Sequence, residues 1–396
     1  MKQPWHVKPL AAVAIVEAGD PAPLGRLLRQ RFDYSRVLHP EAERFVTVRL
    51  YGKGAVQRSV GDGKVPKMSS ALRIRAGDLI YSRIDARNGA FAIVPQDLEG
   101  AVVSKDFPSF AIDRTRVHPQ YLNYFLGTEA FFSQLRASSF GTTNRQRISE
   151  SKLLSHTIPL PPLPEQERIV RILDAAEELR RVRAEADRRT ADIIPAIFYE
   201  MFGDPVRNSM LWPMIRLGEA CDLINGRAFK PNEWGTEGLP IIRIQNLNDA
   251  SKPFNFYSGE LPEKFRVNAG DILLSWSGTP GTSFGCFRWQ GPEGWLNQHI
   301  FNVKLRRGID GEFFIQSVNA RLAELIGKAH GGVGLQHVTK GMLNSTVLLL
   351  PPLPLQRQFA ARVTEVRALE DQQAASRRRL DDLFASLLHR AFQSEL

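Results

Sequence analysis

Short segments of this 396-residue chain combine Arg, Asn, Gln, Ser, Thr and His side chains in contexts typical of loops. Arg, Asn and Gln can pair with the edge of a guanine or adenine, whereas Lys, Ser and Thr hold phosphates. Any one of them alone is more often an ordinary surface residue, so only the groups favour a contact with nucleic acid. The candidates in the first half are Arg49, Lys53, Arg83, Arg87, Asn88, Thr142, Thr143, Asn144, Arg145 and Arg147. Those in the second half are Arg243, Gln245, Asn246, Trp276, Ser277, Thr279, Asn297, Gln298, His299 and His337.

The net charge supports the same class of partner. Lys and Arg number 52 against 42 Asp and Glu, which gives +10 and a pI near 9.7. Such an excess favours nucleic acid first and an acidic membrane surface second, although a merely basic enzyme is the plain alternative. Residues 165–192 and 355–386 together carry 13 Arg and 13 acidic residues. The whole excess therefore lies in the rest of the chain, mainly in the two β-rich segments.

Motifs for catalysis, cofactors and metals are missing from the sequence. Both Pro-Pro pairs follow a leucine, so neither forms the Asn/Asp-Pro-Pro-aromatic loop with which methyltransferases grip an exocyclic amine. A G-x-x-x-x-G-K-[ST] phosphate cradle is missing too. The eight histidines and the two cysteines, Cys221 and Cys286, fit no metal-ligand spacing. We therefore expect no catalytic, cofactor-binding or metal-binding residues in this chain.

The hydrophobic composition, 43%, is ordinary for a folded protein. No stretch reaches about 18 uninterrupted apolar residues, the length of a membrane span. Two cysteines are too few for a disulfide framework, which favours a reducing compartment. We expect a cytoplasmic location.

An internal repeat dominates the sequence. Pro161-Pro162-Leu163-Pro164 returns 190 residues later as Pro351-Pro352-Leu353-Pro354, and ten of 26 positions are identical when residues 141–166 are laid on 331–356. Further upstream, the Ala-Gly-Asp of residues 76–78 returns at 269–271. A repeat of this length indicates that the two halves share one architecture.

Each half has the same predicted order of elements. Short β-rich stretches come first, at residues 45–50, 78–84 and 101–104 and at residues 241–245, 271–276 and 284–289. One helix follows, carrying Tyr121, Phe125, Phe132 and Leu135 in the first half and Phe314, Val318, Leu322 and Leu325 in the second. The proline tract then leads into a long helix. We expect an α+β fold with domains at 1–160 and 206–350 and helical spacers at 161–205 and 351–396.

The long helices carry a narrow apolar stripe. Its steps of three and four residues, sustained over about four heptads, are typical of a coiled coil, whereas a lone amphipathic helix is the alternative. Because each domain precedes its own helix, we expect antiparallel pairing. Gln373 and Ser376 fall on the predicted seam and could fix its register. Pro195 predicts a kink or an early end in the first helix.

This arrangement resembles the specificity (S) subunits of type I restriction–modification systems over nearly the whole chain. The most telling segments are residues 46–54 (VTVRLYGKG), 76–91 (AGDLIYSRIDARNGAF) and 270–281 (GDILLSWSGTPG), with the repeated Pro-Pro-Leu-Pro. The resemblance implies two target-recognition domains that each read one half of a bipartite double-stranded DNA sequence, separated by an antiparallel coiled coil. It also implies a non-catalytic chain that recruits two methyltransferase (M) subunits and restriction (R) subunits. S-adenosylmethionine, ATP and Mg²⁺ are then expected on those partner subunits.

Helices of about 40–45 Å would place the half-site centres about 12 base pairs apart. Two other readings stay open at this point. One is a DNA methyltransferase or nuclease with an unrecognised site, against which the missing methyltransferase loop argues. The other is a scaffold unrelated to DNA, against which the partition of charge argues.

Overall fold

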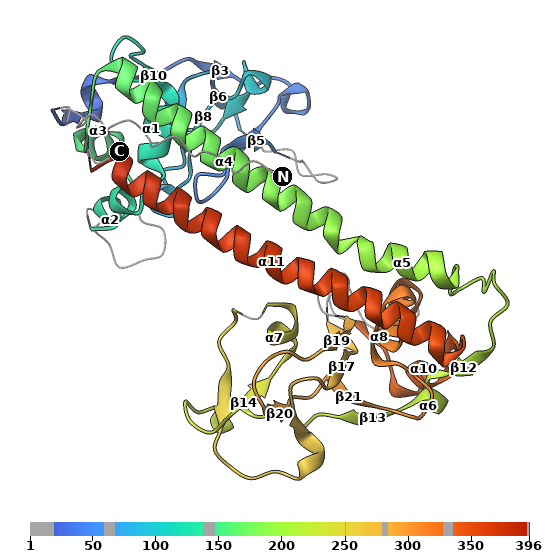
Figure 1. Cartoon of the computed structure of the whole chain (residues 1–396). Helices are drawn as coiled ribbons and strands as arrows, with labels where there is room; N and C mark the ends of the chain where they lie inside the picture. Colours follow the sequence, from blue (N-terminus) through green and yellow to red (C-terminus); the bar gives the residue numbers. More distant parts are fainter. Residues whose placement is uncertain are drawn as a thin grey trace, which may run out of the picture. The chain divides into compact units, whose positions relative to one another are not determined.

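The computed structural model describes residues 20–58, 68–137, 147–249, 251–278, 284–327, 336–393 and 396. Their contacts divide the chain into unit 1, residues 1–183 and 376–396, and unit 2, residues 184–375. The long helices α4 (Leu163–Ala191) and α11 (Leu353–Ala391) contribute to both units, and α5 (Ile193–Phe202) follows α4 (Figure 1). No helix in the described ranges combines the length and the apolar character of a membrane span.

Unit 1 contains one β-rich domain. Its strands are β1 (Ala22–Pro23), β2 (Leu28–Gln30), β3 (Tyr34–Arg36), β4 (Val46–Val48), β5 (Ala55–Gln57), β6 (Ser70–Arg73), β7 (Leu79–Tyr81), β8 (Phe91–Ile93), β9 (Val102–Val103), β10 (Ser109–Ile112) and β11 (Thr157–Ile158). Its α-helices are α1 (Pro119–Leu126), α2 (Glu129–Ala137) and α3 (Glu150–Ser155), and its 3-10 helices include η3 (Ala86–Asn88).

Unit 2 contains the second domain. Its strands are β12 (Met214–Arg216), β13 (Cys221–Asn225), β14 (Leu239–Ile242), β15 (Asn255–Tyr257), β16 (Arg266–Val267), β17 (Ile272–Ser275), β18 (Ser277–Gly278), β19 (Gly285–Arg288), β20 (Gly294–Leu296), β21 (Ile300–Leu305), β22 (Gln336–His337) and β23 (Val347–Leu349). Its helices are α6 (Leu217–Ala220), α7 (Ile244–Asn248), α8 (Gly311–Ala320), α9 (Leu322–Gly327) and α10 (Lys340–Ser345).

The two domains share a sheet topology. A four-stranded antiparallel sheet has the order β2-β10-β7-β8 in unit 1 and β13-β21-β17-β19 in unit 2. In both, a strand pair outside this sheet joins the start of the domain to the segment before the long helix, β1 with β11 and β12 with β23. The repeat read from the sequence is therefore a repeat of architecture.

The repeated Ala-Gly-Asp motif forms the same turn twice. Gly77 and Gly270 adopt left-handed φ values of 79° and 94°, which glycine reaches without steric cost. The N–H of Gly77 donates to the Val94 carbonyl, and that of Gly270 to the Trp289 carbonyl, both at 2.8 Å. The motif thus places β7 and β17 in register with the strands that follow them, β8 and β19.

The core lies on both faces of each four-stranded sheet. In unit 1, Leu79 and Tyr81 of β7 pack under α1 and α2, while Ile80 packs against the second layer of strands. In unit 2, Leu274 of β17 packs under α8, and Leu273 faces the layer that contains β14 and β20. Successive side chains of a strand point to opposite faces of the sheet. Because both faces are buried here, these strands appear in the sequence as continuous apolar runs.

The long helices run antiparallel within each unit. In unit 1, Arg168 of α4 donates to the carbonyl of Leu396, and Arg180 pairs with Asp381 of α11, each at 2.8 Å. In unit 2, the rings of Phe198 and Phe359 lie 5.7 Å apart. The predicted α+β fold with two β-rich domains and an antiparallel pair of long helices is confirmed.

Three local predictions need correction. The single predicted helix of each half is broken, because Thr128 bonds both the Phe125 carbonyl and the Phe131 N–H at the start of α2, and α8 ends before Arg321. The strand predicted at residues 241–245 ends at Ile242, and α7 follows. The predicted apolar stripe of the first long helix includes Leu179 and Val182, and the seam is less closed than predicted, since these side chains are 53% and 51% exposed. The predicted interruption near Pro195 is confirmed, because α4 ends at Ala191 and α5 starts at Ile193.

Candidate nucleic-acid interface

Two candidate segments of unit 1 meet at the loop between β4 and β5. The N–H of Tyr51 donates to the Asn88 carbonyl at 2.8 Å, and the N–H of Gly52 to the Gly89 carbonyl at 2.9 Å. Gly89 has φ +73°, and a Cβ there would lie 2.7 Å from the Phe132 ring and 3.1 Å from the Tyr51 backbone. Only glycine permits this close approach, which brings Arg49 and Lys53 to the same part of the unit as Arg87 and Asn88.

Arg83 and Arg147 lie on a second junction in the same unit. The guanidinium of Arg83 forms an ion pair with Glu150 at the start of α3, and its carbonyl accepts from the Ile148 N–H at 2.9 Å. The buried Tyr81 hydroxyl donates to the Ile148 carbonyl at 3.1 Å. Burial opposes the charge of Arg83, but the Glu150 carboxylate outweighs it and raises the pKa of Arg83. The segment after β7 is therefore fastened to the segment before α3.

Some of the unit 1 candidates are exposed to solvent, whereas others are held in contacts within the unit. Arg49, Lys53, Asn88 and Arg147 are exposed, and Arg147 pairs with Asp106 at 3.1 Å. Arg83 is half-buried and engaged with Glu150. Thr142, Thr143, Asn144 and Arg145 lie outside the described residues.

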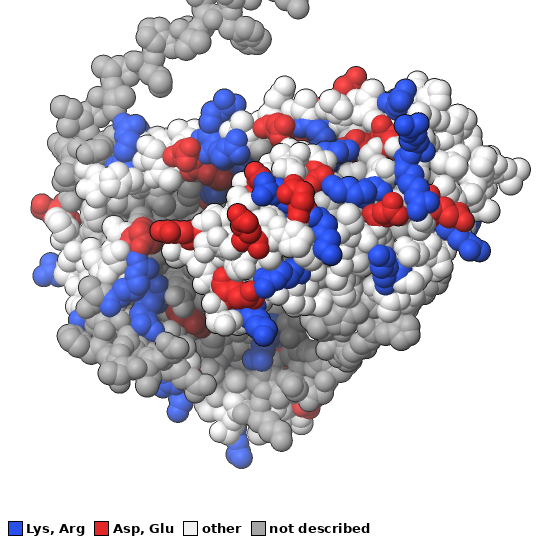
Figure 2. Space-filling model, turned by 90° about the horizontal axis from the view of Figure 1, so that it is seen from below, with Lys and Arg blue, Asp and Glu red and all other residues white. Residues whose placement is uncertain are grey.

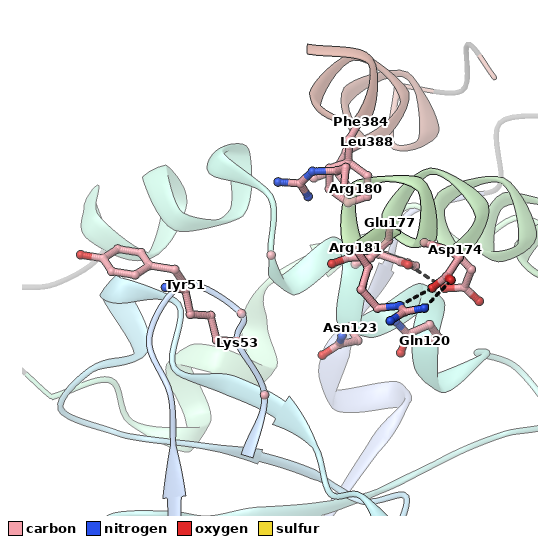
Figure 3. Close-up of a pocket in the computed structure, with 15 residues that line it drawn as sticks. Tyr51, Lys53, Gln120, Asn123, Asp174, Glu177, Arg180, Arg181, Phe384 and Leu388 are labelled. Atoms are coloured by element: carbon pink, nitrogen blue, oxygen red, sulfur yellow. Dashed lines mark hydrogen bonds and ion pairs between the residues drawn. The ribbon is translucent and has the colours of Figure 1, made fainter. Parts of the chain in front are cut away.

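Lys53 also lines a pocket of about 630 Å³ within unit 1. Figure 3 shows Lys53 and Tyr51 on one side of it and the side chains of α4 on the other. Asp174 of α4 accepts a hydrogen bond from the Tyr124 hydroxyl at 2.6 Å. Burial raises the pKa of the Tyr124 phenol, and the Asp174 carboxylate raises it further. Three carboxylates (Asp174, Glu177 and Glu178) and three cations (Lys53, Arg180 and Arg181) line this pocket, so its lining carries no excess of either charge.

In unit 2, Arg243, Gln245 and Asn246 lie at the start of α7. The buried Asn246 side chain accepts from the Arg243 N–H at 3.1 Å and donates to the Lys252 carbonyl at 3.0 Å. The Gln245 amide donates to the Pro253 carbonyl at 3.3 Å. The Arg243 guanidinium lies 5.0 Å from the centroid of the Trp234 ring, a cation–π distance. Asn246 thus stabilises the backbone at the start of α7, and Arg243 supplies the positive charge there.

Trp276, Ser277, His299 and His337 form a second group in unit 2. β18 pairs with β22 so that Ser277 lies opposite His337, and the N–H of Trp276 donates to the His299 carbonyl at 3.2 Å. The rings of Trp276 and His299 lie 4.9 Å apart. His299 has φ +70° without being glycine, and such strain is retained where the surroundings fix it. Thr279 lies outside the described residues.

The segment of residues 297–299 joins these two groups. The N–H of Asn297 donates to the Ile242 carbonyl at 3.1 Å, and that of Gln298 to the Arg227 carbonyl at 2.8 Å. A Cβ on Gly226 would lie 2.0 Å from the Asn297 carbonyl oxygen, so glycine is required there. Unit 2 therefore places candidates from three separated segments side by side.

Arg227 and several exposed aromatic residues are not among the candidates predicted from the sequence. The Arg227 guanidinium lies 4.7 Å from the Phe229 ring centroid and 5.3 Å from that of Tyr257, and it pairs with Glu233. In unit 1, Phe32, between β2 and β3, and Tyr34, the first residue of β3, are exposed. Gly226 before Arg227 was the available signal, since a glycine after a strand often marks a close backbone approach.

One candidate segment occupies a corresponding place in each of the two domains. Phe45 forms a parallel bridge with Val102, and Ile241 pairs in parallel with Trp295. Arg49 and Gln245 each come four residues after the first member of these pairs. On the face shown in Figure 2, Lys and Arg are interspersed with Asp and Glu. Among the described residues in that view, the basic side chains therefore lie in small groups and do not form one continuous positively charged surface.

Comparison with known proteins gives a consistent result. A family model described as "Type I restriction modification DNA specificity domain" matches residues 57–185 and again residues 210–375. The chain is 26% identical over 167 residues to the type I restriction enzyme EcoBI specificity subunit of Escherichia coli, which covers 41% of this chain and 34% of that protein. It is 22% identical over 329 residues to the putative type I restriction enzyme MjaX specificity subunit of Methanocaldococcus jannaschii, covering 76% and 73%.

The match to the E. coli relative thus spans about a third of that protein's length. Solved structures also align over nearly the whole chain. One, described as the structural basis of complex assembly and conformational transition of the type I R-M system, has TM-score 0.58 and 23% identity and covers 99% and 100% of the two chains. The type I restriction-modification S subunit from M. genitalium has TM-score 0.51 and 15% identity and covers 97% and 98%. At these identities the two structures show a shared fold.

Proposed function

The chain belongs to the type I restriction–modification DNA specificity family, and on that premise we propose that it reads a bipartite DNA target, one half with each domain. The observation that carries this proposal is the repeat of one domain architecture with candidate segments at corresponding places, around Arg49 in unit 1 and around Gln245 in unit 2. Because the side chains at these places differ, the two domains would read different sequences.

The base-reading and phosphate-binding roles would fall to different residues. Arg243 and Gln298 carry the planar donors that suit a base edge, whereas the exposed cations Arg49, Lys53 and Arg147 suit phosphates. Asn246 would act indirectly, because its amide is bonded to the backbone on both sides. Of the candidates in the described ranges, Arg243 combines a bidentate guanidinium with an aromatic support.

The proposal assigns no catalytic step to this chain. It would instead hold two methyltransferase subunits and the restriction subunits of a type I complex on its target. S-adenosylmethionine, ATP and Mg²⁺ would bind those partners, since the sequence lacks the loops that grip a target amine or a nucleotide phosphate. Because DNA and these partners are cytoplasmic in a bacterial or archaeal cell, the chain would act there.

Co-purification with the proteins encoded beside this chain tests the proposal. We expect a complex that methylates DNA, and mapping of the methylated sites should give two defined half-sites separated by a fixed gap. Loss of this chain from the complex should abolish sequence-specific methylation. A continuous target without a gap, or the same methylated sites without this chain, would contradict it.

A second measurement addresses the absence of catalysis. Calorimetric titration of the isolated chain with S-adenosylmethionine should show no saturable heat. Saturable binding with a stoichiometry near one would overturn the assignment of the cofactor to a partner.

A further inference from the structure

A buried glutamine lies at the start of each long helix. Gln166 in the first turn of α4 has 0% exposure. Its Oε1 accepts from the His118 N–H at 2.8 Å, and its Nε2 donates to the Arg116 and Pro161 carbonyls at 2.9 and 2.8 Å. One side chain therefore joins α4 to the segment before α1 and to the proline tract.

The second half repeats this arrangement. Gln356 of α11 also has 0% exposure. Its Oε1 accepts from the Asp310 N–H at 2.9 Å, and its Nε2 donates to the Gly308 and Pro351 carbonyls at 3.4 and 2.8 Å. Both the chemistry and the partners are equivalent, although the surrounding residues differ.

Both glutamines satisfy polar groups that have few other partners. Proline has no N–H, so the proline tract cannot form a ladder of backbone hydrogen bonds. The buried carbonyl of Pro161 or Pro351 would lose its partner without the amide, and an unsatisfied buried group is costly. An amide is suited to this position, because it accepts one bond and donates two in one plane.

The position of these bonds matters more than their number. Each joins the first turn of a long helix to the segment that leads into the domain's own helix, α1 in unit 1 and α8 in unit 2. Apolar contacts at the same junction, such as Ile169 in unit 1 and Phe359 in unit 2, pack the helix against its domain, and the amide adds hydrogen bonds that depend on direction. Three hydrogen bonds from one planar amide depend on angle as well as distance, so they constrain the direction of the helix relative to its domain.

We propose that Gln166 and Gln356 are positioning residues that hold each long helix at one angle to its recognition domain and thereby restrict recognition to one gap length. This inference rests on the proposed function. A domain that can tilt on its helix could reach a half-site displaced by one base pair, which moves by about 3.4 Å along the duplex and rotates with it. A helix held at one angle to its domain would not allow the domain to bind the displaced half-site.

A library selection tests this with the full chain in complex with its co-purifying partners. Random DNA duplexes are selected by the wild-type complex and by complexes carrying Gln356→Met or Gln358→Met. Methionine has a similar length to glutamine but neither donates nor accepts strongly. Gln358 is exposed on the same helix two residues later, so it is a matched control.

The wild type and Q358M should enrich two half-sites at one gap. Q356M should enrich the same half-sites at gaps one base pair shorter and longer as well, with its preference for the native gap reduced about tenfold. Thermal unfolding identifies a merely structural effect, which would lower stability and leave the gap preference unchanged. If Q356M does not fold, Gln356→Asn and Gln166→Asn, which keep the amide one methylene shorter, should broaden the gap in the same way.

The inference would be overturned if a folded variant at Gln166 or Gln356 still enriched only the native gap. Altered half-sites at an unchanged gap would overturn it as well. If the wild-type complex itself enriches no bipartite sequence, the proposed function fails instead, so the two failures are distinguishable.

Discussion

Gln373 of α11 donates a hydrogen bond from its Nε2 to the Thr190 hydroxyl of α4 at 2.9 Å. Both residues lie in unit 2, where the two helices run antiparallel. A polar pair on an apolar seam specifies register at some cost in stability. Gln373 was predicted from the sequence to lie on the seam, and its bond to Thr190 shows that the residue does face the partner helix.

Replacing this glutamine with leucine should not destabilise the protein. Thr190 also donates to the Ala186 carbonyl at 3.0 Å, so its hydroxyl stays bonded in Gln373→Leu. We expect the unfolding free energy to stay constant or to rise by about 1 kcal/mol, because an apolar side chain replaces a half-buried polar one. Chemical denaturation measures this, with the exposed neighbour in Gln372→Leu as the control. A loss above about 1 kcal/mol would show that the bond is a net stabiliser.

Gly89 and Gly100 form a matched pair for testing the unit 1 interface. Both have φ +73°, but a Cβ meets the Phe132 ring and the Tyr51 backbone at position 89 and nothing within 4 Å at position 100. Gly100→Ala should cost about 1 kcal/mol of stability through backbone strain alone. Gly89→Ala should cost at least about 1 kcal/mol more, because the loop of residues 49–54 must move.

The functional consequence should differ as well. Gly89→Ala should weaken recognition of the first half-site and leave the second intact, whereas Gly100→Ala should change neither. Methylation mapping of both variants gives the comparison. Equal effects of the two substitutions would show that the contact between Tyr51 and residues 88–89 has no role in recognition.

The Asp271 carboxylate should make stability depend on pH. Burial disfavours its charge, but the Asn268 N–H, the Lys304 ammonium and the Asn302 amide outweigh burial and hold the pKa of Asp271 below its ordinary value of 3.8. The unfolded chain therefore binds this proton at a higher pH than the folded chain does. The stabilisation is fully present above pH 3.8 and is lost as the pH falls through the lower, folded pKa.

Asp271→Asn tests that linkage. At pH 7 the variant should be less stable by about 1–2 kcal/mol, because it loses hydrogen bonds to a charged acceptor. Denaturation at pH values from 7 down to 3 should show the difference between wild type and variant shrinking at the acid end. A difference that stays the same throughout would contradict the assignment of a depressed pKa.

The two domains should be separable in specificity. Replacing residues 206–350 with the corresponding segment of a relative should change one half-site and leave the other unaltered, since the candidate groups of each unit are built from that unit's own segments. Methylation mapping of the chimera gives both half-sites at once. Simultaneous change of both would disprove modular reading.

The sequence by itself determined the duplication, the order of elements and the two long helices. These features follow from periodicity and from repeated local motifs such as the Ala-Gly-Asp turn, in which Gly77 and Gly270 must adopt positive φ. Local steric demands act within a few residues, so they are legible along the chain. The antiparallel direction was also accessible, because each domain precedes its own helix.

Only the tertiary structure decided which polar residues meet and which are used inside the fold. Arg83 pairs with Glu150 across 67 positions, and Gln166 bonds the backbone 48 and 50 residues earlier. Asn246 looked like a base-reading amide in the sequence, yet it is buried and bonded to the backbone. A residue type states which bonds a side chain can make, but packing between distant segments determines which partners come within reach and which groups lose contact with water.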